Sequence, residues 1–534
     1  MTARTFLLEN ARIHTLDPAC PFGRSMLVLH GRVVAVTDEP RPVVTGYGSV
    51  EHVNCNNLVL LPAFTDAHLH LMDTSIQMGT VDVSSAGNEQ EAARMLRNGV
   101  GEVPPGQWVQ GSRWGHNLWD PPSLPSAASL DALFPENPVF LYSKCEHLLW
   151  ANSLAMKIAG ITAQTPDPPG GEIEHDPATG ELTGIFKEDS AYLISNSPPP
   201  MTSEQKRRNL ARAAAHLNRH GIVNVHASDT ADTFALLQDM VWNDPIPLDI
   251  LLYIPASCLD DIISARVRSG FGSERLRFGG IKFFVDGSLG GRTAWMNEPF
   301  CGEPGNIGIP MTNRAELLDR IMRASAAGLC AMTHAIGDHA VELIVDVYRE
   351  AQKAHPFPAD FPLMHRIEHF QLISEAIIAK LPGLRVAASF QPVHIFSDWS
   401  ASDRFWGDRS RFAYAVRTAV DCGLPLVFGS DSPVEPVNVF WGLYAAVCRR
   451  DLNSKPEGGW YPGQAVSPLE ALAAYTSQPC RIAGSGGSKG ILAAGYNADF
   501  VLADGDPLMD DPEKWRSSRV IATALRGEFV HNEL

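Results

Sequence analysis

The sequence has no apolar run long enough to span a membrane, and no segment that reads as an export signal. Near its start, in MTARTFLLENARIHTLD, Glu9 and Arg12 interrupt the stretch in which a signal peptide would be uniformly apolar. These absences exclude an integral membrane protein and argue against secretion. We expect a cytoplasmic protein.

Basic residues are scarce, and paired cysteines are absent. Lys and Arg total 43 against 60 Asp and Glu, a formal charge of -17, with no Lys/Arg cluster. Nucleic acid and anionic membranes are therefore poor partners, which leaves a small-molecule substrate as the expected one. The nine cysteines are scattered singly without a CxxC pair, which favours reduced thiols over disulfides or a zinc finger.

The central part of the chain alternates short apolar runs with helical patterns. Strand candidates lie near 61–66, 222–227, 248–254, 278–285, 329–334, 363–368, 385–391 and 425–430. Eight strands alternating with helices predict a distorted (β/α)8 TIM barrel over 61–484, an α/β fold whose catalytic groups lie at the carboxyl ends of its strands.

Both ends of the chain, and one long insertion, fall outside that alternation. Residues 1–60 and 485–534 contain β-meander signals with glycine turns, and they predict one small β-sandwich built from both termini. Residues 75–200 form an insertion after the first barrel strand. We expect this insertion to act as a lid over the active site.

Metal-ligand residue types recur at the ends of the predicted barrel strands. The candidates are His68 and His70 on strand 1, Lys282 on strand 4, His334 on strand 5, His369 on strand 6 and Asp431 after strand 8. In HLH, residues i and i+2 of an extended segment face one side and can bind the same ion. Such a set predicts a two-metal hydrolytic site around a bridging hydroxide.

Lys282 and Asp431 are the predicted catalytic members of this set. Asp431, in GSDSP, would bind one metal, act as general base and then protonate the leaving nitrogen. An ammonium repels cations, so Lys282 fits only if carbon dioxide converts its amine into a carbamate that bridges both ions. An unmodified Lys282 would leave a mononuclear site.

On these residues the chain resembles the amidohydrolase superfamily, and more closely its type 3 branch, which includes N-substituted formamide deformylase. The resemblance covers nearly the whole chain through FTDAHLHL, IKFFVDGSLGGRTA, THAIGD, RIEHFQ, ASFQPVH, FGSDSPVEPVNVF and GILAAGYNADFVLADGDP. It implies the same barrel and terminal β-sandwich, and the same metal ligands. It also implies zinc, one or two ions per subunit, with iron, manganese or cobalt as alternatives, and a homodimer.

The chain departs from the branch at one place in the insertion. The branch has an Asp-Gly-His segment, whereas this chain has CEHLLWANS, in which Cys145 and Glu146 replace the Asp and Gly while His147, Trp150 and Asn152 remain. The change affects substrate identity more than metal binding. Cys145 is either a further ligand or a plain buried thiol.

Seven residues are predicted to contact the substrate: Trp114, His116, His147, His226, Arg292, Gln391 and His394. The prediction is best supported for Arg292, because its flanking glycines permit close approach of a substrate and a guanidinium forms a bidentate pair with a carboxylate. A histidine such as His226 or His394 could stabilise an oxyanion.

Three functions are compatible with this ligand set. The first is hydrolysis of an amide, N-formyl or cyclic amide C–N bond by a metal-bound hydroxide. The second is a non-hydrolytic iron or manganese enzyme, a decarboxylase, isomerase or oxygenase, since fold does not settle function. The third is a noncatalytic scaffold, which the full ligand set disfavours.

Overall fold

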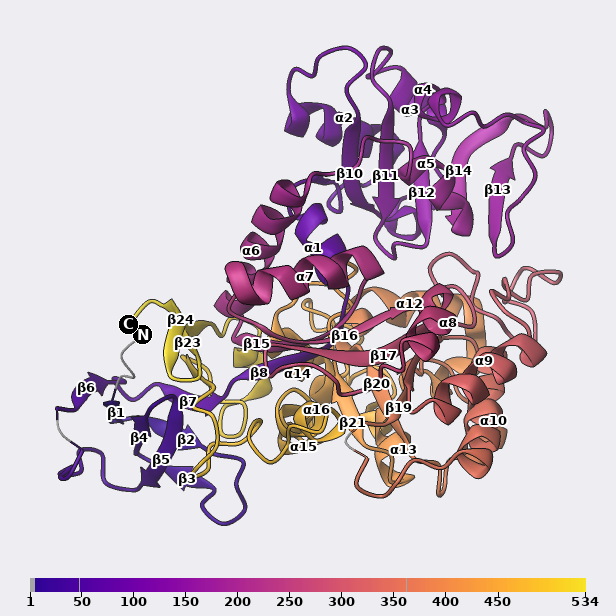
Figure 1. Ribbon diagram of the computed structural model, residues 1–534. Helices are drawn as coiled ribbons and strands as arrows, with labels where there is room; N and C mark the ends of the chain where they lie inside the picture. The colour runs from indigo at the N-terminus through magenta and orange to yellow at the C-terminus, as the bar shows by residue number, and fades with distance from the viewer. Residues whose placement is uncertain (1–4, 48, 362) are drawn as a thin grey trace.

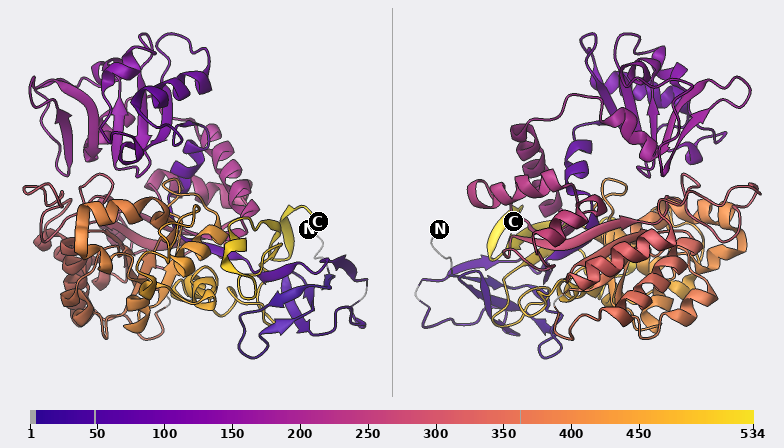
Figure 2. Two further views of the ribbon diagram at one scale, coloured as in Figure 1. Left: turned by 180° about the vertical axis from the view of Figure 1, so that it is seen from behind. Right: turned by 45° about the vertical axis from the view of Figure 1, so that its right-hand side comes forward.

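A computed structural model describes residues 5–47, 49–361 and 363–534 of the protein. Figure 1 shows three parts: a barrel surrounded by helices, a β-sandwich that holds both termini, and a lobe formed by the insertion above the barrel. The two further views in Figure 2 show the same three parts. No helix in the described ranges is both long and apolar enough to cross a bilayer.

The barrel is an eight-stranded parallel sheet in which each strand pairs with the next along the chain. Its strands are β8 (Phe64–Leu69), β15 (Ile222–Ser228), β16 (Asp249–Pro255), β17 (Leu276–Phe284), β18 (Cys330–Ala335), β19 (His365–His369), β20 (Val386–Phe390) and β21 (Leu426–Phe428). The strands are buried almost throughout, as expected when helices cover a parallel sheet. All eight overlap the predicted ranges, and the predicted (β/α)8 fold is confirmed.

The barrel closes just beyond β21. There the Asp431 amide donates to the His68 carbonyl at 2.7 Å, and the His70 amide donates to the Ser432 carbonyl at 2.8 Å. Closure therefore joins the first and last barrel strands at two of the candidate metal ligands.

Helices α1 (Leu71–Gln77) and α6 to α16 surround the sheet, and α17 (Pro512–Trp515) packs against α14. Their bounds are α6 (Ser203–Arg219), α7 (Ala231–Asn243), α8 (Leu259–Ser264), α9 (Arg314–Ala326), α10 (Asp338–Ala354), α11 (Glu375–Lys380), α12 (Ile395–Trp406), α13 (Val416–Asp421), α14 (Val439–Cys448), α15 (Pro468–Ala474) and α16 (Ser477–Ile482). Side-chain caps set several of the starts; Thr202, for example, forms a reciprocal capping box with Gln205 on α6.

Both termini build the β-sandwich. One sheet holds β1 (Thr5–Glu9), β4 (Ser25–Leu29), β5 (Arg32–Thr37) and β6 (Glu51–Asn54). The other holds β2 (Arg12–His14), β3 (Phe22–Gly23), β7 (Val59–Pro62), β22 (Phe500–Ala503), β23 (Val520–Leu525) and β24 (Glu528–Asn532). Because β22 pairs antiparallel with β7, the two ends share one apolar core that includes Phe6, Leu60 and Phe500.

The insertion carries a six-stranded sheet of its own. Its strands are β9 (Val81–Asp82), β10 (Val109–Trp114), β11 (Val139–Ser143), β12 (Leu148–Ala151), β13 (Gly171–His175) and β14 (Leu182–Glu188). Helices α2 (Glu89–Val100), α3 (Ala127–Asp131), α4 (Ser153–Ile158) and α5 (Tyr192–Ser195) flank it. A separate core that includes buried Trp114 and Trp150 gives this lobe a stable shape above the barrel.

Candidate metal centre and substrate pocket

The six predicted ligands converge at the carboxyl ends of the barrel strands. His68 lies in β8, Lys282 in β17, His334 in β18 and His369 at the end of β19. His70 and Asp431 directly follow β8 and β21 in the loops where the barrel closes. His70 is the most exposed of the set, with a side chain 24% exposed, so the candidate centre is sheltered but reachable from one side.

Asp431 stands at the middle of the group. Its Oδ1 lies 3.1 Å from His68 Nε2 and 3.5 Å from His70 Nε2, while its Oδ2 lies 3.7 Å from His394 Nε2. Burial opposes ionisation of Asp431, but the imidazoles of His68 and His70 outweigh it and hold the pKa of this carboxyl well below its usual range. Asp431 is therefore an anion flanked by nitrogen donors.

Two sets of donor atoms around Asp431 are compact enough to hold an ion. His68, His70 and Asp431 form one set and His369, His394 and Asp431 the other, with the ligand atoms of each set within 4.8 Å of one another. His369 Nδ1 and His394 Nε2 are buried without a hydrogen-bond partner among the described residues. Burial also lowers the pKa of His369, so its ring is neutral and offers a lone pair. The residues thus fit a divalent cation that accepts nitrogen and oxygen donors.

His334 belongs to neither of these two donor sets, and one of its ring nitrogens already has a partner. Its Nε2 donates to the carbonyl of Gly287 at 3.0 Å, which leaves Nδ1 unprotonated when the ring is neutral. Burial lowers the pKa of His334 and favours that neutral form. Its ring centroid lies 4.4 Å from that of His369, so the two histidines form one face of the site.

Lys282 is fully inside the barrel, 3.4 Å from His68 Nε2 and over the ring of Phe284. Burial lowers the pKa of its amine to about 8. Near pH 8, a fraction of the protein molecules therefore carries Lys282 as the neutral amine. The neutral amine is the form that reacts with carbon dioxide.

The sequence did not predict a row of buried, hydrogen-bonded polar side chains that lies beneath the ligands. His68 Nδ1 hydrogen-bonds Glu368, Glu368 pairs with Arg366, and Arg366 donates to His226 Nδ1 at 2.9 Å. Such a partner fixes the orientation and tautomer of a ligating histidine. The segment RIEHF could have predicted this row, because Arg366 and Glu368 lie two positions apart in a buried strand and so share one face. Two opposite charges buried on one face are expected to pair.

Asp286 fixes the backbone next to the neighbouring candidate ligand, His334. It accepts hydrogen bonds from the backbone amides of Trp295 at 2.8 Å, Ile336 at 3.0 Å and Gly337 at 2.8 Å. Burial nevertheless raises the pKa of Asp286 to about 7. These bonds fix the loop that follows His334.

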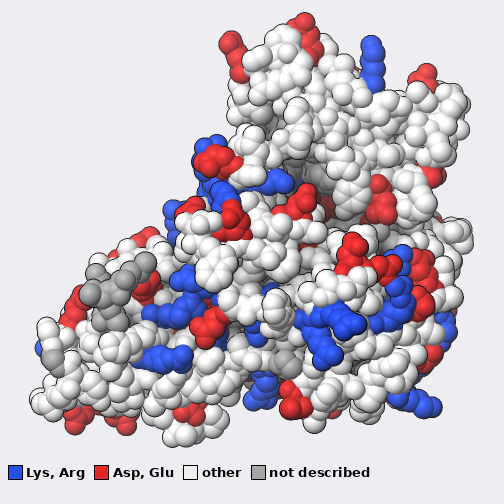
Figure 3. Space-filling view, viewed as in Figure 1, with Lys and Arg blue, Asp and Glu red and all other residues white. Residues whose placement is uncertain are grey.

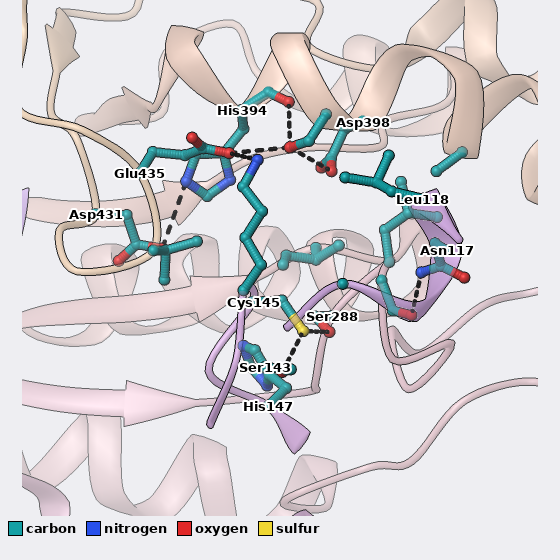
Figure 4. Close-up of a pocket in the computed structure, with 18 of the residues that line it drawn as sticks. Asn117, Leu118, Ser143, Cys145, His147, Ser288, His394, Asp398, Asp431 and Glu435 are labelled. Carbon is teal, nitrogen blue, oxygen red and sulfur yellow. Dashed lines mark hydrogen bonds and ion pairs between the residues drawn. The ribbon is translucent and has the colours of Figure 1, made fainter. Parts of the chain in front are cut away.

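A pocket of about 780 Å³, measured to its open mouth, lies above the candidate centre. The barrel supplies its floor and one wall, including His369 and Asp431, and the insertion supplies the roof. Figure 3 shows the hollow between the two lobes, and Figure 4 shows side chains from both meeting in the pocket. The residues around it are Trp114 to Leu118, Ser143 to Cys145, His147, Ser288 to Gly290, Ile336, His369, Gln371, His394, Ser397, Asp398, Ala401, Asp431, Val434 and Glu435.

Four of the seven predicted substrate contacts line this pocket: Trp114, His116, His147 and His394. His147 is held from behind, because its Nδ1 lies 2.6 Å from a carboxylate oxygen of Glu188. Cys145 lies 3.3 Å from the Ser143 hydroxyl and 3.8 Å from that of Ser288, and burial raises the pKa of its thiol. Cys145 therefore forms part of the pocket wall, and it belongs to neither of the two compact donor sets found among the described residues.

The other three predicted contacts lie elsewhere. Arg292 pairs with Glu303 at 3.1 Å and packs over Phe405, so its guanidinium is already engaged outside the pocket. His226 contacts Arg366 deeper in the barrel. Gln391 is buried, and its amide lies 3.5 Å from the Ser389 hydroxyl, outside the pocket lining.

Three charged residues of the pocket carried no sequence signal. Lys144, Asp398 and Glu435 all line it, on β11's end, α12 and the loop after β21. Glu435 stands in the quoted motif FGSDSPVEP, but nothing in its spacing separates it from a surface acid.

Comparisons with known proteins show which sequences and folds this chain is similar to. Protein LONG AFTER FAR-RED 3 of Arabidopsis thaliana is 30% identical over 542 residues, which cover 98% of this chain and 91% of that protein. N-substituted formamide deformylase of Arthrobacter pascens is 26% identical over 98% of both chains. An uncharacterised metal-dependent hydrolase from Pyrococcus horikoshii OT3 superposes with a TM-score of 0.76 and 27% identity, covering 95% of this chain and 99% of that one.

A sequence model of the amidohydrolase family matches residues 51–531, which include the barrel, the insertion and every candidate ligand. The likeness predicted from the motifs is thereby confirmed. The chain belongs to the amidohydrolase family, in its type 3 branch.

Proposed function

We propose that this protein hydrolyses the C–N bond of a small amide, N-formyl or cyclic amide compound with the help of bound metal. The observation that carries the proposal is the position of Asp431 at the pocket floor, with His68 and His70 on one of its oxygens and His394 near the other. The relative from Arthrobacter pascens, named as an N-substituted formamide deformylase, favours a non-peptide amide as the substrate.

The centre would be held by His68 and His70 on one side and by His334 and His369 on the other, with Asp431 between them and Lys282 beneath. When bound, a divalent metal such as zinc supplies a Lewis acid that polarises the carbonyl and lowers the pKa of water. Zinc suits these donors; iron, manganese and cobalt accept them too. Whether each subunit binds one ion or two depends on whether Lys282 carries a carbamate.

The protein's own groups then handle the proton. Asp431 is anionic and lies at the pocket floor, so it accepts a proton from the attacking water and returns it to the leaving nitrogen. Glu368 holds His68 in one orientation throughout. His147, held by Glu188, lies with its ring centroid 5.5 Å from that of His334 and would contact a substrate bound there.

The direct test is a screen on protein stripped with a chelator and then reloaded. Purified protein is dialysed against chelator, and hydrolysis of N-formyl, N-acyl and cyclic amides is measured with and without added zinc, manganese or cobalt. We expect only the reloaded protein to form amine and carboxylic acid groups in equal amounts, as two products from N-formyl and N-acyl amides and as one ring-opened product from a cyclic amide. Metal-independent turnover, or oxygen consumption or carbon dioxide release without hydrolysis, would contradict the proposal. Light scattering on the same sample tests the homodimer, which stays a prediction.

A further inference from the structure

One end of the pocket carries more negative than positive charge. Figure 4 shows Glu435, Asp398 and His394 grouped there, away from Cys145 and His147 at the other end. Lys144 is the one cationic side chain, other than histidine, among the residues that line the pocket, and its Nζ lies 2.9 Å from Glu435 Oε1. This pair neutralises itself, so Asp398 is left without a cationic partner in the described pocket.

The hydrogen bonds of Asp398 leave one of its oxygens open. Oδ2 accepts from the Tyr414 hydroxyl at 2.6 Å and from the Gln371 amide at 3.0 Å. These two donors occupy Oδ2. Burial and the charge of Glu435 raise the pKa of Asp398, a shift that a cation beside its other oxygen would oppose. Among the residues that the structure describes, the one hydrogen-bond donor within 3.5 Å of Oδ1 is the hydroxyl of Ser397.

Ser397 cannot satisfy that oxygen. Its single hydroxyl hydrogen faces three acceptors: Glu435 Oε1 at 2.9 Å, the His394 carbonyl at 3.3 Å and Asp398 Oδ1 at 3.5 Å. The shortest and charge-assisted contact, to Glu435, takes the hydrogen. Asp398 Oδ1 therefore keeps free lone pairs beside the cavity.

Apolar side chains also line the pocket. Leu118, Leu289, Ile336, Ala401 and Val434 line it together with the carboxylates. A hydrocarbon segment fits beside such side chains, and the half-buried Asp398 carboxylate with its open oxygen favours a cationic group there. His394 Nε2, 3.7 Å from Asp431 Oδ2, connects this end of the pocket to the candidate metal centre.

We propose that Asp398, with Glu435 beside it, forms a specificity subsite for a substrate ammonium group, so that the preferred substrate is an amide whose short hydrocarbon chain ends in a basic amine. This inference rests on the proposed amide hydrolysis and narrows its substrate class.

The first experiment compares two compounds of equal length that differ only in charge. N-(4-aminobutyl)formamide ends in an ammonium group where N-pentylformamide ends in a methyl group. If neither formyl compound is a substrate, the same pair is made on the best acyl group found in the screen. We expect kcat/KM for the charged member to exceed that for the neutral member at least tenfold with metal-loaded protein.

Charge changes in opposite directions then test the subsite itself. Asp398→Asn removes the free carboxylate, and we expect the ratio of kcat/KM, charged over neutral, to fall at least tenfold. Lys144→Met releases Glu435 from its pair, and we expect the ratio to rise. Asp403→Asn, an exposed acid on the same helix α12, is the matched control and should leave the ratio unchanged. A purely structural role of these residues would not move the ratio in two directions.

Binding is measured separately, so that failure of the subsite and failure of the hydrolase proposal remain distinct. Calorimetry with metal-loaded protein should show n-pentylammonium binding at least tenfold more tightly than 1-pentanol, with the difference lost in Asp398→Asn. Equal binding, or equal turnover of the charged and neutral amides, would overturn the subsite while hydrolysis stands. Ammonium-selective binding without hydrolysis of any amide would overturn the hydrolase proposal instead.

Discussion

At the scale of single residues, Asp431 combines three tasks. It lies between two histidine pairs, its backbone amide closes the barrel, and its carboxylate reaches the pocket. Its backbone φ of 59° falls in the left-handed region, which a non-glycine residue adopts at a cost and which is common at functional sites. The side chain is therefore fixed by the fold before any substrate arrives.

Replacing Asp431 by Asn should remove proton transfer while preserving shape. We expect kcat on the best amide substrate to fall by about 10²–10⁴-fold, the usual contribution of a general base. Steady-state kinetics and metal analysis on the same sample check this. Unchanged turnover at full metal content would show that Asp431 does not carry the proton.

Glu368 would affect metal binding indirectly, by orienting the candidate ligand His68. Glu368→Gln keeps a hydrogen-bond acceptor but loses the charge, and we expect metal affinity to fall roughly 10–100-fold. Competition with a chelator of known affinity measures it. Glu375→Gln, an exposed acid at the start of α11, is the control and should retain the affinity of the parent protein.

Prediction from sequence worked best for residues whose chemistry is tied to strand ends. The histidines and Asp431 follow apolar runs, so their convergence follows from the barrel. Arg292 shows the limit of this approach: its flanking glycines suggested substrate contact, but Glu303, in the same long loop, pairs with it. Asp398 lies on a helix with no motif of its own, and only the folded pocket reveals its open oxygen.

At the scale of elements, one buried helix cap, Asn152, connects several parts of the insertion to one another. The Asn152 side chain starts α4 by accepting from the Ala155 amide, and it also accepts from Val139. Its amide donates to the carbonyls of Asn137 and Phe134. One side chain thus joins a helix, a strand and a loop of the roof.

Asn152→Ala should therefore cost more than the loss of an ordinary cap. We expect a loss of about 2 kcal/mol or more, because buried backbone groups lose their partners, against about 1 kcal/mol for the exposed cap Thr202→Ala. Thermal unfolding of both variants gives the comparison. Equal shifts of the two melting temperatures would contradict the argument.

At the scale of the whole molecule, one buried acid connects the barrel to the C-terminal segment. Asp249 of β16 accepts two hydrogen bonds from Arg526, at 2.7 and 2.9 Å, and pairs with Lys489. Sequence patterns predicted that both termini share a small sheet, but no local pattern links a strand residue to partners more than two hundred positions later.

Asp249→Asn would leave two cations beside an uncharged amide in a buried site. We expect destabilisation of about 3–5 kcal/mol, the usual result of breaking one side of a buried pair. Asp239→Asn breaks only the exposed pair with Arg207 and should cost less than about 1 kcal/mol. A shift in thermal unfolding no larger for Asp249→Asn than for Asp239→Asn would show that this connection contributes little.

The backbone hydrogen bonds that join β8 to the segment after β21 also have a consequence for how the protein folds during synthesis. His68 and Asp431 meet only when the last barrel strand is present, and at ordinary rates of translation the residues between them take roughly 20–70 s to synthesise. Until then His68 and His70 lack the Asp431 carboxylate that lies beside both of them in the folded protein. A nascent chain on the ribosome therefore lacks a complete metal site, and metal capture belongs to the final stage of folding.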